Sequence, residues 1–140
     1  MKNKHNHPIA EVYVHRDFVP VDLAEMAENM THEEINEFIF VTLPKVMEDS
    51  MADPYRPKTQ LFHDLIGWSR SVFFSMKKPP RKLNPDCRFL YRYDRDNKNF
   101  YKLAVGFRNA KGVNTDGDDE DSIYYKAKNR PKDPEYWDKE

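Results

Sequence analysis

The stretch 87–108 constrains the fold of this chain more than any other part of the sequence. Two runs rich in aromatic and apolar residues, 87–94 and 100–108, flank a polar turn at 95–99. Strand-forming runs around a turn rich in Asp and Asn are typical of a β-hairpin. The sequence therefore predicts an antiparallel hairpin over 87–108.

Alternation within the hairpin predicts two different faces, because successive side chains of a strand point to opposite sides of the sheet. The first face is apolar and aromatic, and it carries Cys87, Phe89, Tyr91, Tyr93, Tyr101, Leu103, Val105 and Phe107. The second face is largely basic, and it carries Arg88, Leu90, Arg92, Phe100, Lys102, Ala104, Gly106 and Arg108.

This division of faces requires a hairpin loop with an odd number of residues, because the side-chain period of a strand is two. A three-residue loop at 97–99 meets the requirement and places Asn99 in the left-handed conformation, which asparagine tolerates. A two-residue loop at 96–97 instead pairs Tyr91 with Lys102 and mixes the faces. We therefore expect the odd loop.

The N-terminal half predicts one strand and two helices. Residues 9–18 alternate apolar and polar side chains, as a strand does, and the hairpin is their best partner. Residues 20–30 predict a short amphipathic helix. Thr31 and Glu34 have the spacing of a capping box at the start of a second helix, expected over 32–51, which Pro44 should kink or break.

The interval 58–76 has the clearest helical pattern in the chain. Its apolar residues recur with the i, i+3, i+4 spacing for five turns, with Trp68 and Phe74 off that stripe. Residues 109–121 are rich in Asp and Gly and predict a loop, and residues 122–128 are a candidate for a further strand.

Together these elements predict an α+β fold. We expect a three- or four-stranded antiparallel sheet, with the hairpin 87–108 at its centre, packed on one side by two to three helices. The chain of 140 residues fits a single domain. We place that domain at 1–128 and a C-terminal tail at 129–140. The tail residues Tyr136 and Trp137 dock either on the domain or on a partner, and the sequence leaves both possibilities open.

Charge is strongly segregated along the chain, although the formal net charge is only −1. Residues 1–53 carry −7, residues 54–113 carry +10 and residues 114–140 carry −4. Such blocks indicate either partner recognition or pairing inside the fold. A single cysteine, no apolar run of about 20 residues and no apolar leader at the N-terminus favour a cytoplasmic location.

No catalytic motif is recognisable, and we expect no catalytic residues, metal or cofactor. The phosphate-binding glycine loop, the His-Glu-x-x-His helix and the Ser-centred elbow are all missing. Cys87 falls on the expected core face, which is typical of an inert buried thiol. Asn114, Asp116 and Asp118 alternate as in a calcium loop, but Asp119 stands where that loop requires glycine, so we expect a solvated acidic loop.

The favoured function is a small non-enzymatic protein-interaction module. Separate acidic and basic surfaces steer a protein toward a complementary partner, and aromatic side chains anchor interfaces. A phage or mobile-element regulator or inhibitor that binds a larger protein or nucleoprotein machine fits this description. The expected partner anchors are Trp68, Phe74, Tyr136 and Trp137.

The alternative is binding of single-stranded nucleic acid, either RNA or DNA. Basic side chains neutralise phosphates and exposed aromatic rings stack on bases. The candidate residues, which serve equally for a protein partner, are Arg88, Arg92, Phe100, Lys102, Arg108, Lys77, Lys78, Arg81 and Lys82.

A third reading comes from a resemblance. The residue pattern of the hairpin resembles the central strands of the RelE/ParE toxin superfamily over about 22 residues. The pattern is Arg-Phe-Leu-Tyr-Arg-Tyr-Asp followed by Phe-Tyr-Lys-Leu-Ala-Val-Gly-Phe-Arg. The resemblance implies a compact α+β fold and a metal-independent ribonuclease. In that case Arg88, Arg92, Lys102 and Arg108 contact phosphate and stabilise the transition state.

Overall fold

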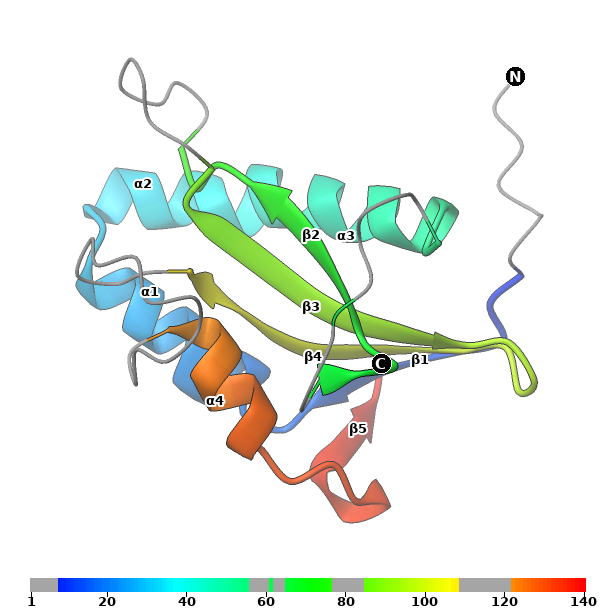
Figure 1. The fold of residues 1–140 in the computed structure, drawn as a ribbon. Helices are drawn as coiled ribbons and strands as arrows, with labels where there is room; N and C mark the ends of the chain where they lie inside the picture. The colour runs from blue at the N-terminus through cyan, green and yellow to red at the C-terminus, as the bar shows by residue number, and fades with distance from the viewer. Residues whose placement is uncertain (1–7, 56–60, 62–64, 77–84, 109–121) are drawn as a thin grey trace, which may run out of the picture.

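The computed structural model describes residues 8–55, 61, 65–76, 85–108 and 122–140. They form a five-stranded sheet in the order β2-β3-β4-β1-β5 (Figure 1). The strands are β1 (Glu11–His15), β2 (Ser69–Phe73), β3 (Cys87–Asp94), β4 (Asn99–Phe107) and β5 (Trp137–Lys139). The α+β class is confirmed, and β1 confirms the first predicted strand.

The sheet is mixed, so the expectation of a three- or four-stranded antiparallel sheet is wrong in detail. β1 runs parallel to β4, whereas the pairs β2–β3, β3–β4 and β1–β5 are antiparallel. A short turn forces neighbouring strands to be antiparallel, but a long connection does not. Most of the chain lies between β1 and β4, and local sequence therefore leaves their relative direction open.

The helices are α1 (Ala24–Glu28), α2 (His32–Glu37), α3 (Leu43–Ala52) and α4 (Ile123–Asn129). π-helical turns at Phe18–Leu23 and Phe38–Thr42 lead into α1 and α3. The predicted capping box is present, because the Glu34 amide donates to Thr31 Oγ1 at 3.1 Å and the Thr31 amide donates to Glu34 Oε1 at 2.8 Å. The helix expected over 32–51 is therefore α2, a π turn and α3 in succession.

Both faces of the sheet are covered, whereas the sequence predicted helices on one side only. The first face carries Phe89, Tyr91 and Phe100, which form one core with residues of α1 to α3. On the second face Leu90 and Ala104 form a smaller core with Ile123 and Ala127 of α4. Figure 1 shows α2 and α3 in line along the sheet and α4 separate from them.

The hairpin loop has four residues, so the predicted three-residue loop at 97–99 is wrong. Asp94 pairs with Asn99, and Lys98 rather than Asn99 has positive φ, at 59°. Tyr91 pairs with Lys102, the register that was expected to mix the faces.

A β-bulge reconciles this register with a two-sided sheet. The bulge lies opposite Leu90 and Tyr91, where Leu103 is the extra residue of β4. One extra residue restores the alternation, because it shifts the rest of the strand by one position. As a result the first core receives Phe100 before the bulge and Val105 after it.

The helix predicted over 58–76 is wrong for the described residues of that interval, because residues 69–73 form β2. Gly67 has a φ of +92°, which no right-handed helix contains. Pairing with the edge of β3 then buries Ser69 and Ser71. Residues 58–60 and 62–64 of this interval, the basic connector 77–82 and the loop 109–121 with its calcium-like spacing lie outside the described residues.

The candidate strand at 122–128 is also wrong, because this segment is α4. The side chain of Ser122 caps the helix by accepting a hydrogen bond from the Tyr124 amide at 3.1 Å. Beyond α4, the segment expected as a tail supplies β5, which pairs Trp137 with His15 of β1.

Candidate binding surfaces

One row of side chains crosses the second face of the sheet at the end that lies beyond α4. Strand pairing places Arg92 of β3 beside Tyr101 of β4, and Tyr101 beside Tyr13 of β1. Trp68 directly precedes β2, whose first residue pairs with Tyr91, so Trp68 continues the row next to Arg92. Directly paired side chains contact each other on a sheet face.

Trp137 of β5 closes over this row and completes a cavity of about 390 Å³. Its ring stacks on Trp68, with centroids 6.0 Å apart and planes at 7°, and meets Tyr101 edge-on at 5.1 Å. Tyr13 and Tyr101 stack at 5.3 Å. We call this cavity the aromatic pocket; it is lined by Tyr13, Trp68, Arg92, Tyr101, Lys132, Pro134 and Trp137.

Two cationic side chains border the aromatic pocket. Arg92 is exposed. The Lys132 ammonium donates hydrogen bonds to the carbonyl oxygens of Ala127 and Arg130, both at 2.8 Å. Burial, reinforced by the charge of Arg130, lowers the pKa of Lys132.

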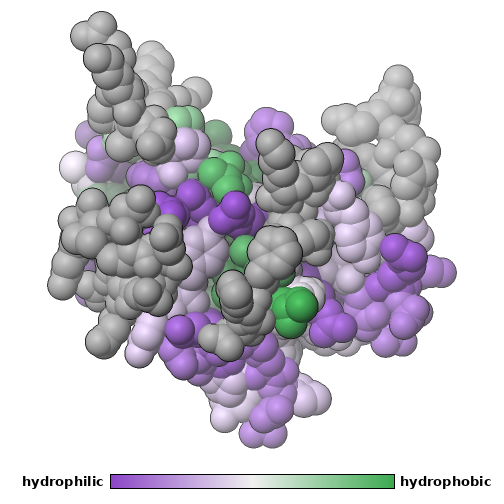
Figure 2. Space-filling view, viewed as in Figure 1, coloured by the Kyte–Doolittle hydropathy of each residue, from purple (hydrophilic) through white to green (hydrophobic). Residues whose placement is uncertain are grey.

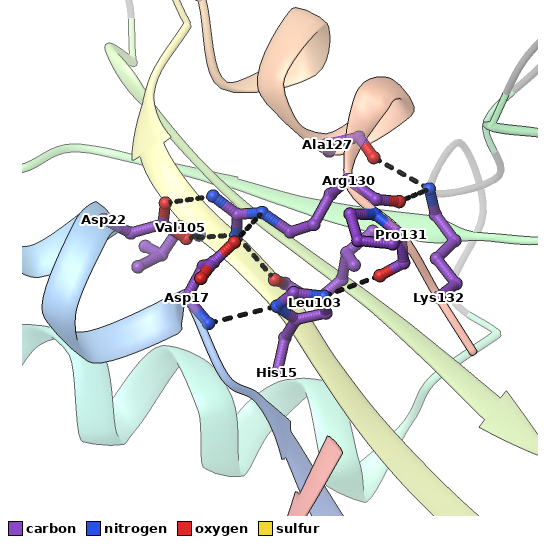
Figure 3. A network of polar contacts seen from close by, with 9 residues as sticks. All are labelled: His15, Asp17, Asp22, Leu103, Val105, Ala127, Arg130, Pro131 and Lys132. Atoms are coloured by element: carbon purple, nitrogen blue, oxygen red, sulfur yellow. Dashed lines mark hydrogen bonds and ion pairs between the residues drawn. The ribbon is translucent and has the colours of Figure 1, made fainter. Parts of the chain in front are cut away.

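A buried ion pair fixes the segment that carries Lys132 and Trp137 (Figure 3). The Arg130 guanidinium binds the Asp22 carboxylate through two hydrogen bonds, of 2.7 and 2.9 Å, and donates to the Leu103 carbonyl at 3.0 Å. Asp22 also accepts from the Val105 amide at 3.1 Å. Burial opposes the charge on Arg130, but the bonds to Asp22 outweigh it and raise the pKa of Arg130.

His15 joins β1 to the same segment. Its Nδ1 accepts a hydrogen bond from the Asp17 amide at 3.1 Å, so the proton of the neutral ring is on Nε2, which donates to the Pro131 carbonyl at 2.7 Å. Burial lowers the pKa of His15 and favours this neutral form.

The expected partner anchors divide into two groups. Trp68 and Trp137 contact each other within the fold, as described above. Tyr136 stacks on His15 at 6.2 Å and lies under the guanidinium of Arg16, so the C-terminal aromatic residues dock on their own chain. Phe74 is half-buried just beyond β2 and does not line the pocket.

The predicted basic face of the hairpin does not exist as one exposed surface. Phe100 is fully buried in the first core. Lys102 is only 4% exposed and forms an ion pair with Glu140 at 2.8 Å. The register explains this. Lys102 pairs with Tyr91, a residue of the first core, and lies between the hairpin loop and the bulge, where the side chains of β4 point to the face opposite to the predicted one.

Arg88 does lie on the second face but is buried, and it donates hydrogen bonds to Tyr124 Oη of α4 and to the carbonyls of Pro85 and Cys87. Arg108 is half-buried beyond β4. Arg92 alone among the described candidates is both basic and exposed. The remaining candidates, Lys77, Lys78, Arg81 and Lys82, lie outside the described residues.

An exposed apolar site on the helices of the first face was not predicted from the sequence. Phe40 is 75% exposed and Val41 is 54% exposed. Residues 31–53 around them contain six acidic side chains and one lysine, Lys45, whose ammonium lies 3.3 Å from the Asp49 carboxylate. We call the exposed side of residues 31–53 the acidic helical surface.

The π turn explains why Phe40 and Val41 face outward. The Leu43 amide donates to the Phe38 carbonyl five residues earlier, and both of these side chains are buried. The wide turn therefore brings positions five apart to the same side and leaves Phe40 and Val41 outside, whereas Ile39 packs against the core. The sequence did indicate an irregular turn here, because Pro44 has no amide hydrogen to donate to the carbonyl four residues earlier.

The described residues offer few groups for catalysis. They contain no cluster of three or more His, Cys, Asp or Glu that could hold a metal ion. Cys87 is buried, and burial raises the pKa of its thiol, so the thiolate is disfavoured. No described helix is both long enough and apolar enough to cross a membrane.

Neither a family model, nor a curated protein, nor a solved structure matches this chain. The aromatic pocket and the acidic helical surface are therefore the basis for a functional proposal. The first can hold a planar group beside positive charge, and the second can hold an apolar group beside negative charge.

Proposed function

We propose that this protein is an interaction module that binds a larger protein through the acidic helical surface. The observation that carries the proposal is the exposure of Phe40 and Val41, at 75% and 54%, side by side on the helices. Scattered apolar residues are normal on a surface, but an adjacent pair within a charged segment fits the apolar centre and polar rim of an interface.

The chemistry of this surface defines its partner. Glu33, Glu37 and Glu48 belong to the same segment as Phe40, and the net charge of residues 31–53 is −5. The partner therefore presents an apolar side chain flanked by lysine or arginine. Charges around the rim of such an interface increase the association rate and select the orientation of docking.

A symmetric dimer through this surface is disfavoured. A twofold axis brings the same patch of both subunits together. Acidic side chains then oppose acidic side chains, and this arrangement costs free energy. A basic partner avoids the repulsion, so we propose a heterologous complex, with this chain as a regulator or inhibitor of a larger machine.

The proposal is tested by retention of host proteins on the immobilised full chain, measured by quantitative mass spectrometry. The test variant is Phe40→Ser with Val41→Ser, and the matched control is Val72→Ser, because Val72 is 45% exposed on β2, away from this surface. We expect one host protein that the wild type and the control retain and that the test variant loses.

A charge variant distinguishes a specific interface from nonspecific hydrophobic adsorption. Glu33→Lys with Glu37→Lys should also release the same protein, and raised salt should weaken its retention by the wild type. The proposal is wrong if every retained protein binds the Phe40→Ser, Val41→Ser variant as well as the wild type.

A further inference from the structure

The aromatic pocket lies on the sheet face opposite to α2 and α3, so its ligand need not be the protein partner. Trp68, Tyr101 and Trp137 line one cavity, with the centroid separations of 6.0 and 5.1 Å given above, and of the two tryptophans Trp68 is buried whereas Trp137 is half-buried. Aromatic side chains bind planar ligands by stacking, which contributes about 1–3 kcal/mol for each base in single-stranded nucleic acids.

The charges around the pocket select an anion. Arg92 lies directly across from Tyr101 and is exposed, and its positive charge also contributes, after hydrogen bonds from Asn97, to the lowered pKa of the Asp94 carboxyl in the same strand. Lys132 uses two of the three donors of its ammonium on carbonyl oxygens. An aromatic site that binds a cation lacks such positive groups, because like charges repel.

We propose that the aromatic pocket binds a nucleoside monophosphate unit, either as a free mononucleotide or as one residue of a single strand. The base stacks on the accessible part of the half-buried Trp137 ring, which is itself supported by the buried Trp68 ring stacked on it. The phosphate binds the Arg92 guanidinium, with Lys132 as a second donor. A cavity of about 390 Å³ lies within the ordinary range for small-ligand sites.

The two tryptophans make the pocket directly observable. The chain contains Trp68 and Trp137 and no other tryptophan, and both line the cavity. All of the tryptophan fluorescence therefore arises from the proposed site. We would titrate 5′-AMP and 5′-UMP, and separately a short oligouridylate, into the full chain, with excitation at the red edge of the tryptophan absorption.

The proposal predicts saturable quenching by the nucleotides. Free mononucleotides that bind as well as the oligouridylate identify a small-molecule site, and much tighter binding of the oligouridylate identifies a site for a single strand. In Arg92→Gln the nucleotides should bind about tenfold more weakly, the loss of one charge-assisted contact. Binding of the matching nucleosides should not change.

Arg95→Gln is the matched control, because Arg95 is an exposed arginine of the hairpin loop that does not line the pocket. It should bind like the wild type. The proposal is wrong if no nucleotide quenches saturably, if Arg92→Gln binds nucleotides as the wild type does, or if inorganic phosphate or an acidic peptide competes as well as the nucleotide.

Discussion

Arg88 and Arg92 are four residues apart on one face of β3, yet their surroundings are opposite. Arg88 is 8% exposed and donates hydrogen bonds to Tyr124 and to two backbone carbonyls. Arg92 lies at the open end of the face. The environment of an arginine in a strand therefore depends on which element packs over that part of the sheet.

This contrast predicts different effects of the same substitution. Arg88→Glu buries a carboxylate against carbonyl oxygens and should lower the free energy of unfolding by roughly 3 kcal/mol or more. Arg92→Glu should change it by less than about 0.5 kcal/mol. Urea denaturation of the two variants measures both values, and equal destabilisation would contradict the placement of these residues.

The buried His15 predicts a pH dependence of stability. Its pKa is lowered by burial, so the unfolded chain binds the proton more tightly than the folded chain. The stabilisation is present above the ordinary histidine pKa and is lost as the pH falls through it toward the lower folded value. The wild type should therefore lose more stability than His15→Gln between about pH 8 and about pH 5.5.

Denaturation curves of both proteins at several pH values provide the measurement. Titration of the other groups is common to the two proteins and cancels in the difference. A difference that is constant with pH would show that His15 is not the titrating group.

At the scale of elements, the hairpin combines a strained loop with a compensating bulge. Lys98 has a φ of 59°, a conformation that costs a residue with a Cβ about 1–2 kcal/mol. Lys98→Gly should therefore raise the free energy of unfolding by about 0.5–1 kcal/mol, whereas Lys98→Ala should not. The urea midpoints of the two variants measure this difference. A midpoint for Lys98→Gly equal to that for Lys98→Ala would exclude backbone strain at this position.

The elements that the sequence predicted correctly are those that short-range chemistry determines. The capping box needs only Thr31 and Glu34, three residues apart, and the hairpin needs two strand-like runs around a turn. The helix predicted at 58–76 failed because its apolar spacing also fits a chain that turns at Gly67 and then pairs with β3. Backbone pairing with a strand about 20 residues away in sequence is not visible in a local pattern.

The candidate sites were predicted only in part for the same reason. Trp68, Trp137 and Arg92 were all chosen from the sequence, but their convergence in one pocket depends on sheet order. Lys102 and Phe100 were placed on the wrong face because the hairpin loop has four residues instead of three, and the bulge at Leu103 restores the predicted alternation only beyond them. Phe40 and Val41 were missed because the π turn redirects them.

At the scale of the molecule, the two ends of the described chain hold the sheet together. β1 and β5 are paired, Arg130 binds Asp22, and Glu140 binds Lys102. Stability thus depends on the last eleven residues as well as on the cores. Hydrophilic side chains cover most of the described surface on the face that Figure 2 shows, with hydrophobic atoms in small separate areas.

Truncation after Asn129 tests this dependence. It leaves Asp22 buried without its partner, which by itself costs about 3–5 kcal/mol, and it removes β5. A domain of this size is stable by about 5–15 kcal/mol, so the truncated chain should be partly or wholly unfolded at room temperature. Circular dichroism and a thermal melt report the result, and a melt like that of the full chain would show that 130–140 is a dispensable tail.

The acidic helical surface is the centre of the proposed function, and site-specific photo-crosslinking in the cells that produce the protein tests it most directly. A photoreactive phenylalanine analogue at position 40 should form a crosslink to one discrete protein. The same analogue at position 72, an exposed site on β2, should not. Crosslinking of that protein from position 72 and none from position 40 would place the partner elsewhere and contradict the account.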